Sequence, residues 1–160
     1  MKNLKKIVIQ DKPFFVLESS SENYSSYTWP CAIILANYIA KNLDLTGFKT
    51  LELGSGTGLV SMVAEKICGA NVTLTDLPEK SWFDNIETSC RHNSILKYKI
   101  KPIVWAEQIQ EKVSFIFASD TLYNPWFFDK FIYTLYSALS QNDQCYALVT
   151  IQDREYINHC

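Results

Sequence analysis

The chain has 160 residues, a formal net charge of −2, 48% hydrophobic residues and 20% charged residues. This length fits one domain, and the composition is that of an ordinary globular protein rather than a disordered one. The charge balance has no basic excess, so it gives no sign of direct nucleic-acid binding. Nine Tyr, nine Phe and four Trp suit a core and a pocket for planar groups.

The cysteine and histidine pattern does not indicate a metal site. No two of the five cysteines have the close spacing of a zinc or redox pair, which favours a reducing compartment. The longest apolar stretch, residues 31–40, is too short to span a bilayer, and the N-terminus lacks the apolar core of a signal peptide. We therefore expect a cytoplasmic or nuclear protein that does not enter a membrane. The five cysteines are Cys31, Cys68, Cys90, Cys145 and Cys160, and the two histidines are His92 and His159.

The first 42 residues predict a hairpin, a loop and a helix. Two short apolar runs, Ile7–Ile9 and Phe14–Leu17, flank a polar turn, as in a β-hairpin. A Ser-rich loop follows over residues 19–26. Thr28 is typical of an N-cap, and Pro30 of a first helical turn, so we expect a helix to about residue 42.

Strands and helices alternate from residue 49 onward. Repeated βα units predict a Rossmann-like α/β fold, with a mostly parallel sheet and helices on both faces. Ligands of such sheets bind at the carboxyl ends of the strands. We therefore expect an N-terminal hairpin and loop (1–26) and a Rossmann-like domain (27–160). Strands are expected at 50–53, 71–75, 100–105, 113–119 and 145–151, and helices at 58–68, 82–93 and 124–139.

A glycine-rich loop follows the first of these strands, with the sequence Glu-Leu-Gly-Ser-Gly-Thr-Gly over residues 52–58. Glycines at alternate positions permit a tight turn and the close approach of a ligand. A dinucleotide motif would have a third glycine where Leu59 stands, and the Gly-Lys-Ser/Thr of a phosphate loop is missing. The loop therefore favours a nucleoside without phosphates.

Asp76 comes at the end of the second strand, about one βα unit later. A carboxylate at this place can accept hydrogen bonds from both ribose hydroxyls of a nucleoside. The alternative is that Asp76 only opens a turn with Leu77 and Pro78.

Four segments carry a resemblance to a known family: Tyr27–Pro30, Glu52–Gly58, Ala118–Tyr123 and Gln152–Arg154. Together they resemble the seven-strand class of S-adenosylmethionine methyltransferases, within it the methyltransferase-like branch that modifies proteins. The last segment departs from the usual Tyr-Glu-x-Arg pattern, because Ile151 stands in the place of the tyrosine.

The resemblance implies that the chain binds S-adenosyl-L-methionine. Asp76 would hold the ribose hydroxyls, and Trp105 would lie against the adenine, since an indole face suits a planar ring. Glu52 would fix the glycine loop or bind the amino group of the cofactor. The alternative for Trp29 and Trp105 is simple packing. The other residues that the family pattern places around the cofactor are Trp29, Gly54, Ser55, Gly56 and Ser119.

The resemblance also places Asp120 and Tyr123 at the catalytic end of the site. Asp120 could hold an incoming ammonium or guanidinium by a charge-assisted hydrogen bond. Tyr123 could add its ring face or its hydroxyl to the same cation. The alternative is that Asp120 only ends a strand and Tyr123 packs under the next helix.

The acceptor is predicted less sharply than the cofactor. The run Trp-Pro-Cys-Ala at residues 29–32 is similar to the methyltransferase-like protein twenty-three subgroup, which is associated with histone arginine methylation. The Asp-x-x-Tyr pattern at 120–123 is instead similar to that of lysine-modifying relatives. Both imply a protein substrate, such as a histone or a chaperone-like protein.

Two other functions stay open. The seven-strand fold ends in an antiparallel strand hairpin, and we expect this chain to lack it, because residue 160 follows shortly after the fifth strand. The fifth strand would then expose an apolar edge. Either the chain is a fragment or short isoform, or another subunit or the N-terminal hairpin covers that edge. A binding or scaffold protein with weak or no catalysis is therefore one alternative, and a small-molecule methyltransferase is another.

Overall fold

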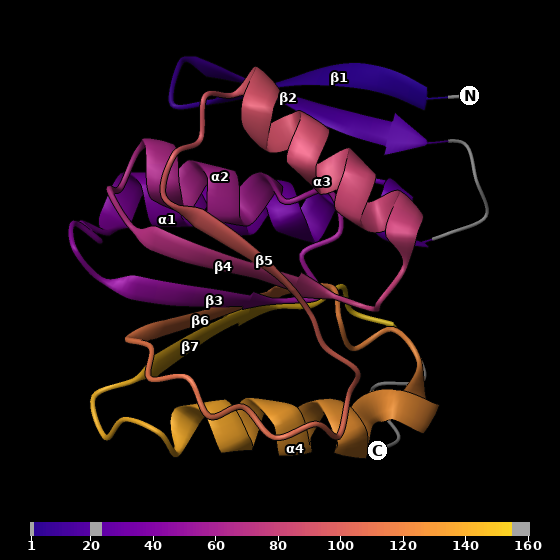
Figure 1. Cartoon of the computed structure of the whole chain (residues 1–160), viewed down its shortest axis with the longest axis vertical. Coiled ribbons are helices and arrows are strands. Elements are labelled where there is room, and N and C mark those ends of the chain that lie inside the picture. The colour runs from indigo at the N-terminus through magenta and orange to yellow at the C-terminus, as the bar shows by residue number, and fades with distance from the viewer. Residues whose placement is uncertain (1, 20–23, 155–160) are drawn as a thin grey trace.

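A computed structural model describes residues 2–19 and 24–154. Its centre is a five-stranded parallel sheet in the order β5-β4-β3-β6-β7 (Figure 1). Residues 20–23 of the expected polar loop, as well as His159 and Cys160, lie outside the described residues. The strands are β3 (Lys49–Leu53), β4 (Asn71–Asp76), β5 (Tyr98–Pro102), β6 (Phe115–Ser119) and β7 (Tyr146–Thr150).

Helices cover both faces of the sheet. Helices α1, α2 and α3 lie on one face, and α4 lies on the other (Figure 1). The predicted Rossmann-like α/β fold is therefore confirmed. No helix among the described residues is long and apolar enough to cross a bilayer. The helices are α1 (Pro30–Asn42), α2 (Leu59–Lys66), α3 (Lys80–His92) and α4 (Phe128–Leu139), with short 3-10 turns η1 (Tyr24–Ser26) and η2 (Pro125–Phe127).

The N-terminal segment forms the predicted hairpin, from β1 (Lys2–Ile9) and β2 (Lys12–Ser19). Gln10 and Asp11 both have positive φ, as a tight two-residue hairpin turn requires. The hairpin packs on α3, α1 and α2 instead of joining the main sheet (Figure 1). Of the alternatives for the edge of the fifth strand, a cover by this hairpin does not match the structure, because its apolar face packs against these helices.

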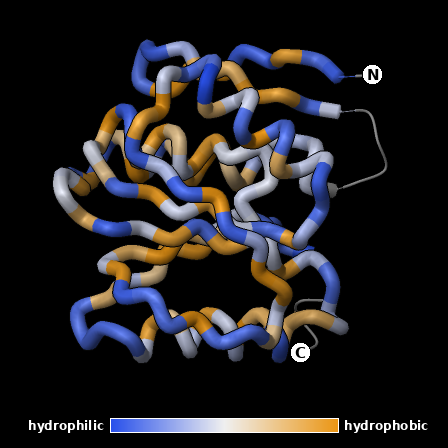
Figure 2. Tube along the Cα trace, viewed as in Figure 1, coloured by the Kyte–Doolittle hydropathy of each residue, from blue (hydrophilic) through white to orange (hydrophobic). Residues whose placement is uncertain are grey.

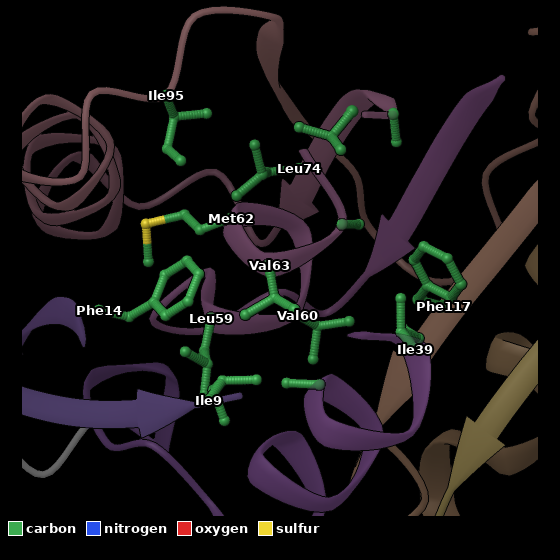
Figure 3. Packing of buried hydrophobic residues seen from close by; sticks show 14 of the residues in the cluster. Ile9, Phe14, Ile39, Leu59, Val60, Met62, Val63, Leu74, Ile95 and Phe117 are labelled. Atoms are coloured by element: carbon green, nitrogen blue, oxygen red, sulfur yellow. The ribbon is translucent and has the colours of Figure 1, made fainter. Parts of the chain in front are cut away.

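The parallel sheet separates two hydrophobic clusters. Alternate residues of β3 and β6, such as Leu51 and Ile116, pack toward α4, whereas Leu74 and Phe117 point toward the other helices. Apolar segments run through the centre of the fold in Figure 2. Figure 3 shows residues from the hairpin, α1, α2, β4, β6 and the loop before β5 meeting in the larger cluster. The hairpin is thus part of the core that supports the sheet.

Two local predictions differ from the structure. Thr28 is not the N-cap of α1, because Trp29 holds that position without a side-chain cap. The Thr28 hydroxyl is used elsewhere, in a 2.9 Å hydrogen bond with the hydroxyl of Thr57. The third strand of the main sheet ends at Pro102 rather than at Trp105, since its partner β4 ends at Asp76 opposite Pro102.

Candidate functional site

A cavity of about 1100 Å³ lies at the carboxyl ends of β3, β4 and β6. This is the edge of a parallel sheet where ligands bind. The structure brings eight of the ten predicted site residues to the cavity, whereas Glu52 and Ser55 are buried and do not line it. No cluster of three potential metal ligands is found among the described residues. The eight are Trp29, Gly54, Gly56, Asp76, Trp105, Ser119, Asp120 and Tyr123.

Gly54 lies where two walls of the cavity come close together. Its φ is +69°, a conformation that L side chains rarely adopt. A Cβ at this position would lie 2.8 Å from Cγ2 of Thr121 and 3.5 Å from Cζ2 of Trp105. A side chain at position 54 would therefore strain the backbone and collide with Thr121, which explains the glycine at this position.

Asp76 is held by three donors. Its carboxylate accepts hydrogen bonds from the Gly56 N–H at 2.8 Å, the Leu77 N–H at 2.8 Å and the Ser25 hydroxyl at 3.2 Å. Burial raises the pKa of Asp76, and these donors oppose the increase. Carboxylate oxygens have further lone pairs, so Asp76 can still accept from a ligand.

The Ser25 contact connects η1 to the cavity. Ser25 lines the cavity and places its backbone oxygen 3.6 Å from where a Cβ of Gly56 would stand. The sequence predicted only a polar loop here, because a serine in a Ser-rich segment carries no signal of its own. The segment after the hairpin therefore forms a wall of the site next to Asp76.

Glu52 supports the glycine loop from below. One carboxylate oxygen accepts hydrogen bonds from the Ser61 N–H at 3.0 Å and the Ser61 hydroxyl at 2.6 Å, at the start of α2. Burial raises the pKa of Glu52 to about 8. Ser55 is also buried, and its hydroxyl donates a hydrogen bond to the Thr75 carbonyl at 3.0 Å. The contacts with Ser61 hold the Glu52 side chain against the first turn of α2, directly after the glycine loop.

Trp105 forms one wall of the cavity. Its indole packs edge-to-face on Phe131 of α4, with ring centroids 5.2 Å apart. The ring therefore has both a packing partner in the core and a surface in the cavity. The two roles considered for Trp105, packing in the core and contact with a ligand, are therefore compatible.

Two buried polar atoms at the cavity have no hydrogen-bond partner among the described residues: Oδ1 of Asn85 and Oγ1 of Thr121. A buried polar atom without a partner costs about 1–3 kcal/mol. A polar ligand could supply partners for both, which fits a nucleoside. The sequence prediction missed these residues. Thr121 lies within the segment 118–123 that carried the resemblance, whereas Asn85 lies inside a helix with no motif around it.

Asp120 is paired with a cation from the chain itself. The two guanidinium nitrogens of Arg154 donate to the two carboxylate oxygens at 2.7 and 2.8 Å. The sequence predicts an incoming substrate cation at this carboxylate and gives no role to Arg154. The residues are 34 positions apart, so no local pattern connects them. Arg154 is therefore a partner of Asp120 that the prediction did not include, and a direct contact between Asp120 and the acceptor stays a prediction.

Tyr123 lies at the mouth of the cavity. It lines the cavity and is 40% exposed. In the alternative, in which Tyr123 packs under the next helix, its side chain would be largely buried. Part of the residue is therefore accessible, and a contact between Tyr123 and the acceptor stays a prediction.

The buried Glu52 predicts a pH dependence of stability. Between about pH 4.5, its ordinary pKa, and about pH 8, the unfolded chain loses the proton that the folded chain keeps. The free energy of unfolding should therefore fall with rising pH by about 1.4 kcal/mol per pH unit from this group. Glu52→Gln should gain stability over the wild-type chain from pH 5 to pH 8, measured by urea unfolding. Glu107→Gln, at an exposed position, is the control. A difference for Glu52→Gln that stays constant over this range would contradict the assignment.

Comparison with known proteins gives consistent results. The family model described as lysine methyltransferase matches residues 9–159. The histone-arginine methyltransferase METTL23 of Rattus norvegicus is 33% identical over 138 residues, which cover 82% of this chain and 61% of that protein. The protein-lysine methyltransferase METTL21E of Bos taurus is 29% identical over 74% of this chain and 44% of that protein. The chain thus spans less than two thirds of the length of these two relatives.

A solved structure supports the fold. The 16S rRNA N2 G1207 methyltransferase of T. thermophilus has a TM-score of 0.68 to this chain, with 12% sequence identity, over 88% of this chain and 39% of that one. At this identity the likeness concerns the fold alone. The family model, in contrast, matches nearly the whole sequence and includes the glycine loop, Asp76 and Asp120. The chain belongs to the lysine methyltransferase family.

Proposed function

We propose that this chain is an S-adenosylmethionine-dependent methyltransferase that acts on a lysine or arginine side chain of a protein. One observation carries the proposal: the glycine loop, Asp76 and the paired Asp120 line a single cavity at the carboxyl edge of the sheet. Membership of the lysine methyltransferase family supports the reaction class, and members of this family use S-adenosylmethionine.

The residues of the cavity fit this cofactor. Asp76 would accept hydrogen bonds from the ribose hydroxyls, and Trp105 would lie against the adenine ring. The unpartnered oxygens of Asn85 and Thr121 would gain partners from a nucleoside. The volume of about 1100 Å³ leaves space for an acceptor side chain beside the cofactor.

The bound cofactor would supply a methyl group on a positively charged sulfur, already activated for transfer. The chain then has to align the acceptor nitrogen and exclude water. A lysine acceptor must also lose a proton, which costs about 4–5 kcal/mol at pH 7 for an ordinary pKa of about 10.4. The exposed ring of Tyr123 would contact the incoming cation by its face.

The relatives support a protein acceptor of two kinds. One relative is a histone-arginine methyltransferase, and another is a protein-lysine methyltransferase. We therefore propose a protein side chain with a nitrogen nucleophile and include histones as the first acceptor to test.

Cofactor binding is testable by thermal unfolding with S-adenosylhomocysteine. A hundredfold excess over its dissociation constant should stabilise the chain by about 2.7 kcal/mol, a rise of several degrees. Asp76→Asn should abolish most of this rise, because an amide cannot replace the carboxylate in accepting from both hydroxyls. Asp84→Asn, at an exposed position on α3, should keep it. NAD and ATP serve as ligand controls. No specific rise in a folded wild-type chain would overturn the proposal.

Methyl transfer is testable with labelled S-adenosylmethionine and purified core histones, followed by amino-acid analysis for methyl-lysine and methyl-arginine. Tyr123→Ala should lower kcat/KM about tenfold, whereas Tyr123→Phe should keep most of it, because the ring face is retained. Tyr133→Ala removes a 51% exposed tyrosine from α4 and should have no effect. Transfer only into the small-molecule fraction of a cell extract would contradict a protein acceptor.

A further inference from the structure

The ion pair between Asp120 and Arg154 is fixed by the sheet. Asp120 directly follows β6, has φ of +55°, and donates its N–H to the Thr150 carbonyl at 2.8 Å. Thr150 is the last residue of β7, and Arg154 follows four positions later. The Thr150 hydroxyl donates to the Cys31 carbonyl of α1 at 3.2 Å, which ties this end of β7 to the helix. The two partners therefore come from neighbouring strand ends.

The pair is well shielded and has the geometry of a strong contact. The side chains of Asp120 and Arg154 are only 3% and 17% exposed. Both carboxylate oxygens are used in a fork with two guanidinium nitrogens, which fixes the rotation of the carboxylate. Arg154 also donates to the Gln152 side-chain oxygen at 3.3 Å. Asp120 is thus held in one orientation.

The other charged residues of the cavity lie on different elements. Among the described residues these are Lys2 of β1, Asp76 of β4 and Glu79 just before α3. None of them follows β6 or β7. At the β6–β7 end of the cavity, Arg154 is therefore the cation that balances Asp120.

This balance matters for the proposed reaction, on which the inference rests. In the transfer, the acceptor nitrogen gives an electron pair to the methyl carbon, and the sulfur keeps the pair of the bond that breaks. Positive charge passes from sulfur to nitrogen. An unbalanced carboxylate close to the sulfur would stabilise the charged starting state and so slow the reaction. A neutral pair avoids that cost.

We propose that Arg154 is a positioning residue that orients Asp120 and cancels its charge at the β6–β7 end of the cavity, where the methyl group would be transferred. It acts through Asp120 rather than on the acceptor. Removing either partner alone should therefore change how the cavity discriminates between a cationic and a neutral ligand. Removing both should restore the original discrimination, because the net charge is again unchanged.

The test compares four proteins: the wild-type chain, Arg154→Ala, Asp120→Asn and the double variant. Calorimetric titration gives the dissociation constants of S-adenosylmethionine, a cation, and S-adenosylhomocysteine, its neutral counterpart. Relative to the wild-type chain, Arg154→Ala should increase the preference for S-adenosylmethionine over S-adenosylhomocysteine by about tenfold. Asp120→Asn should decrease this preference by a similar factor. This is the effect of one unit charge at roughly 10 Å with an effective dielectric constant of about 20. The double variant should return close to the wild-type ratio.

Controls separate charge from structure and from the proposed function. Arg91→Ala removes an exposed arginine on α3 and should leave the ratio unchanged. Arg154→Lys keeps the charge and should also keep the ratio. Should Arg154→Ala not fold, Asp120→Asn against the double variant tests the same charge, since the double variant leaves no buried carboxylate unpaired. Equal ratios in all four proteins would overturn the role of Arg154. Failure of the wild-type chain to bind either ligand would instead overturn the proposed function.

Discussion

The hydrogen bond from the Gly56 N–H to Asp76 ties the loop after β3 to the end of β4, and the candidate site depends on it. Parallel pairing brings the ends of β3, β4 and β6 to one edge, and this bond fixes how the first two face each other. Ser25 then reaches the same carboxylate from the segment after the hairpin. The cavity is therefore enclosed by parts of the chain that are far apart in sequence, and the N-terminal hairpin helps to form it through its packing on α3 and α1.

Three buried carboxylates in and below this site are stabilised in three different ways. Glu52 lies in the core with its pKa raised to about 8, so at neutral pH it is mostly protonated. The charge of Asp76 is stabilised by hydrogen bonds from two backbone N–H groups and a hydroxyl. Asp120 has a guanidinium fork. A buried carboxylate without such compensation is costly, and the three solutions suit the three proposed tasks of loop support, ribose recognition and charge balance.

The sequence predicted the fold and much of the cavity because their signals are local. The glycine loop and Asp76 each follow a strand with a clear apolar pattern, and parallel topology brings strand ends together. Three features of the site could not be predicted from the sequence. The burial of Glu52 against Ser61 depends on how α2 packs on the sheet, since the side chain leaves β3 on the face opposite Leu51 and Leu53. The Asp120–Arg154 pair joins residues 34 positions apart and needs the register of β6 with β7. Asn85 reaches the cavity only because α3 packs with that face inward.

The most direct test of this account is a crystal structure of the chain with S-adenosylhomocysteine. In that structure the ribose hydroxyls should lie within hydrogen-bond distance of Asp76, the adenine beside Trp105, and the sulfur toward the Asp120–Arg154 pair. A ligand bound outside this cavity, or inside it without a contact to Asp76, would contradict the account.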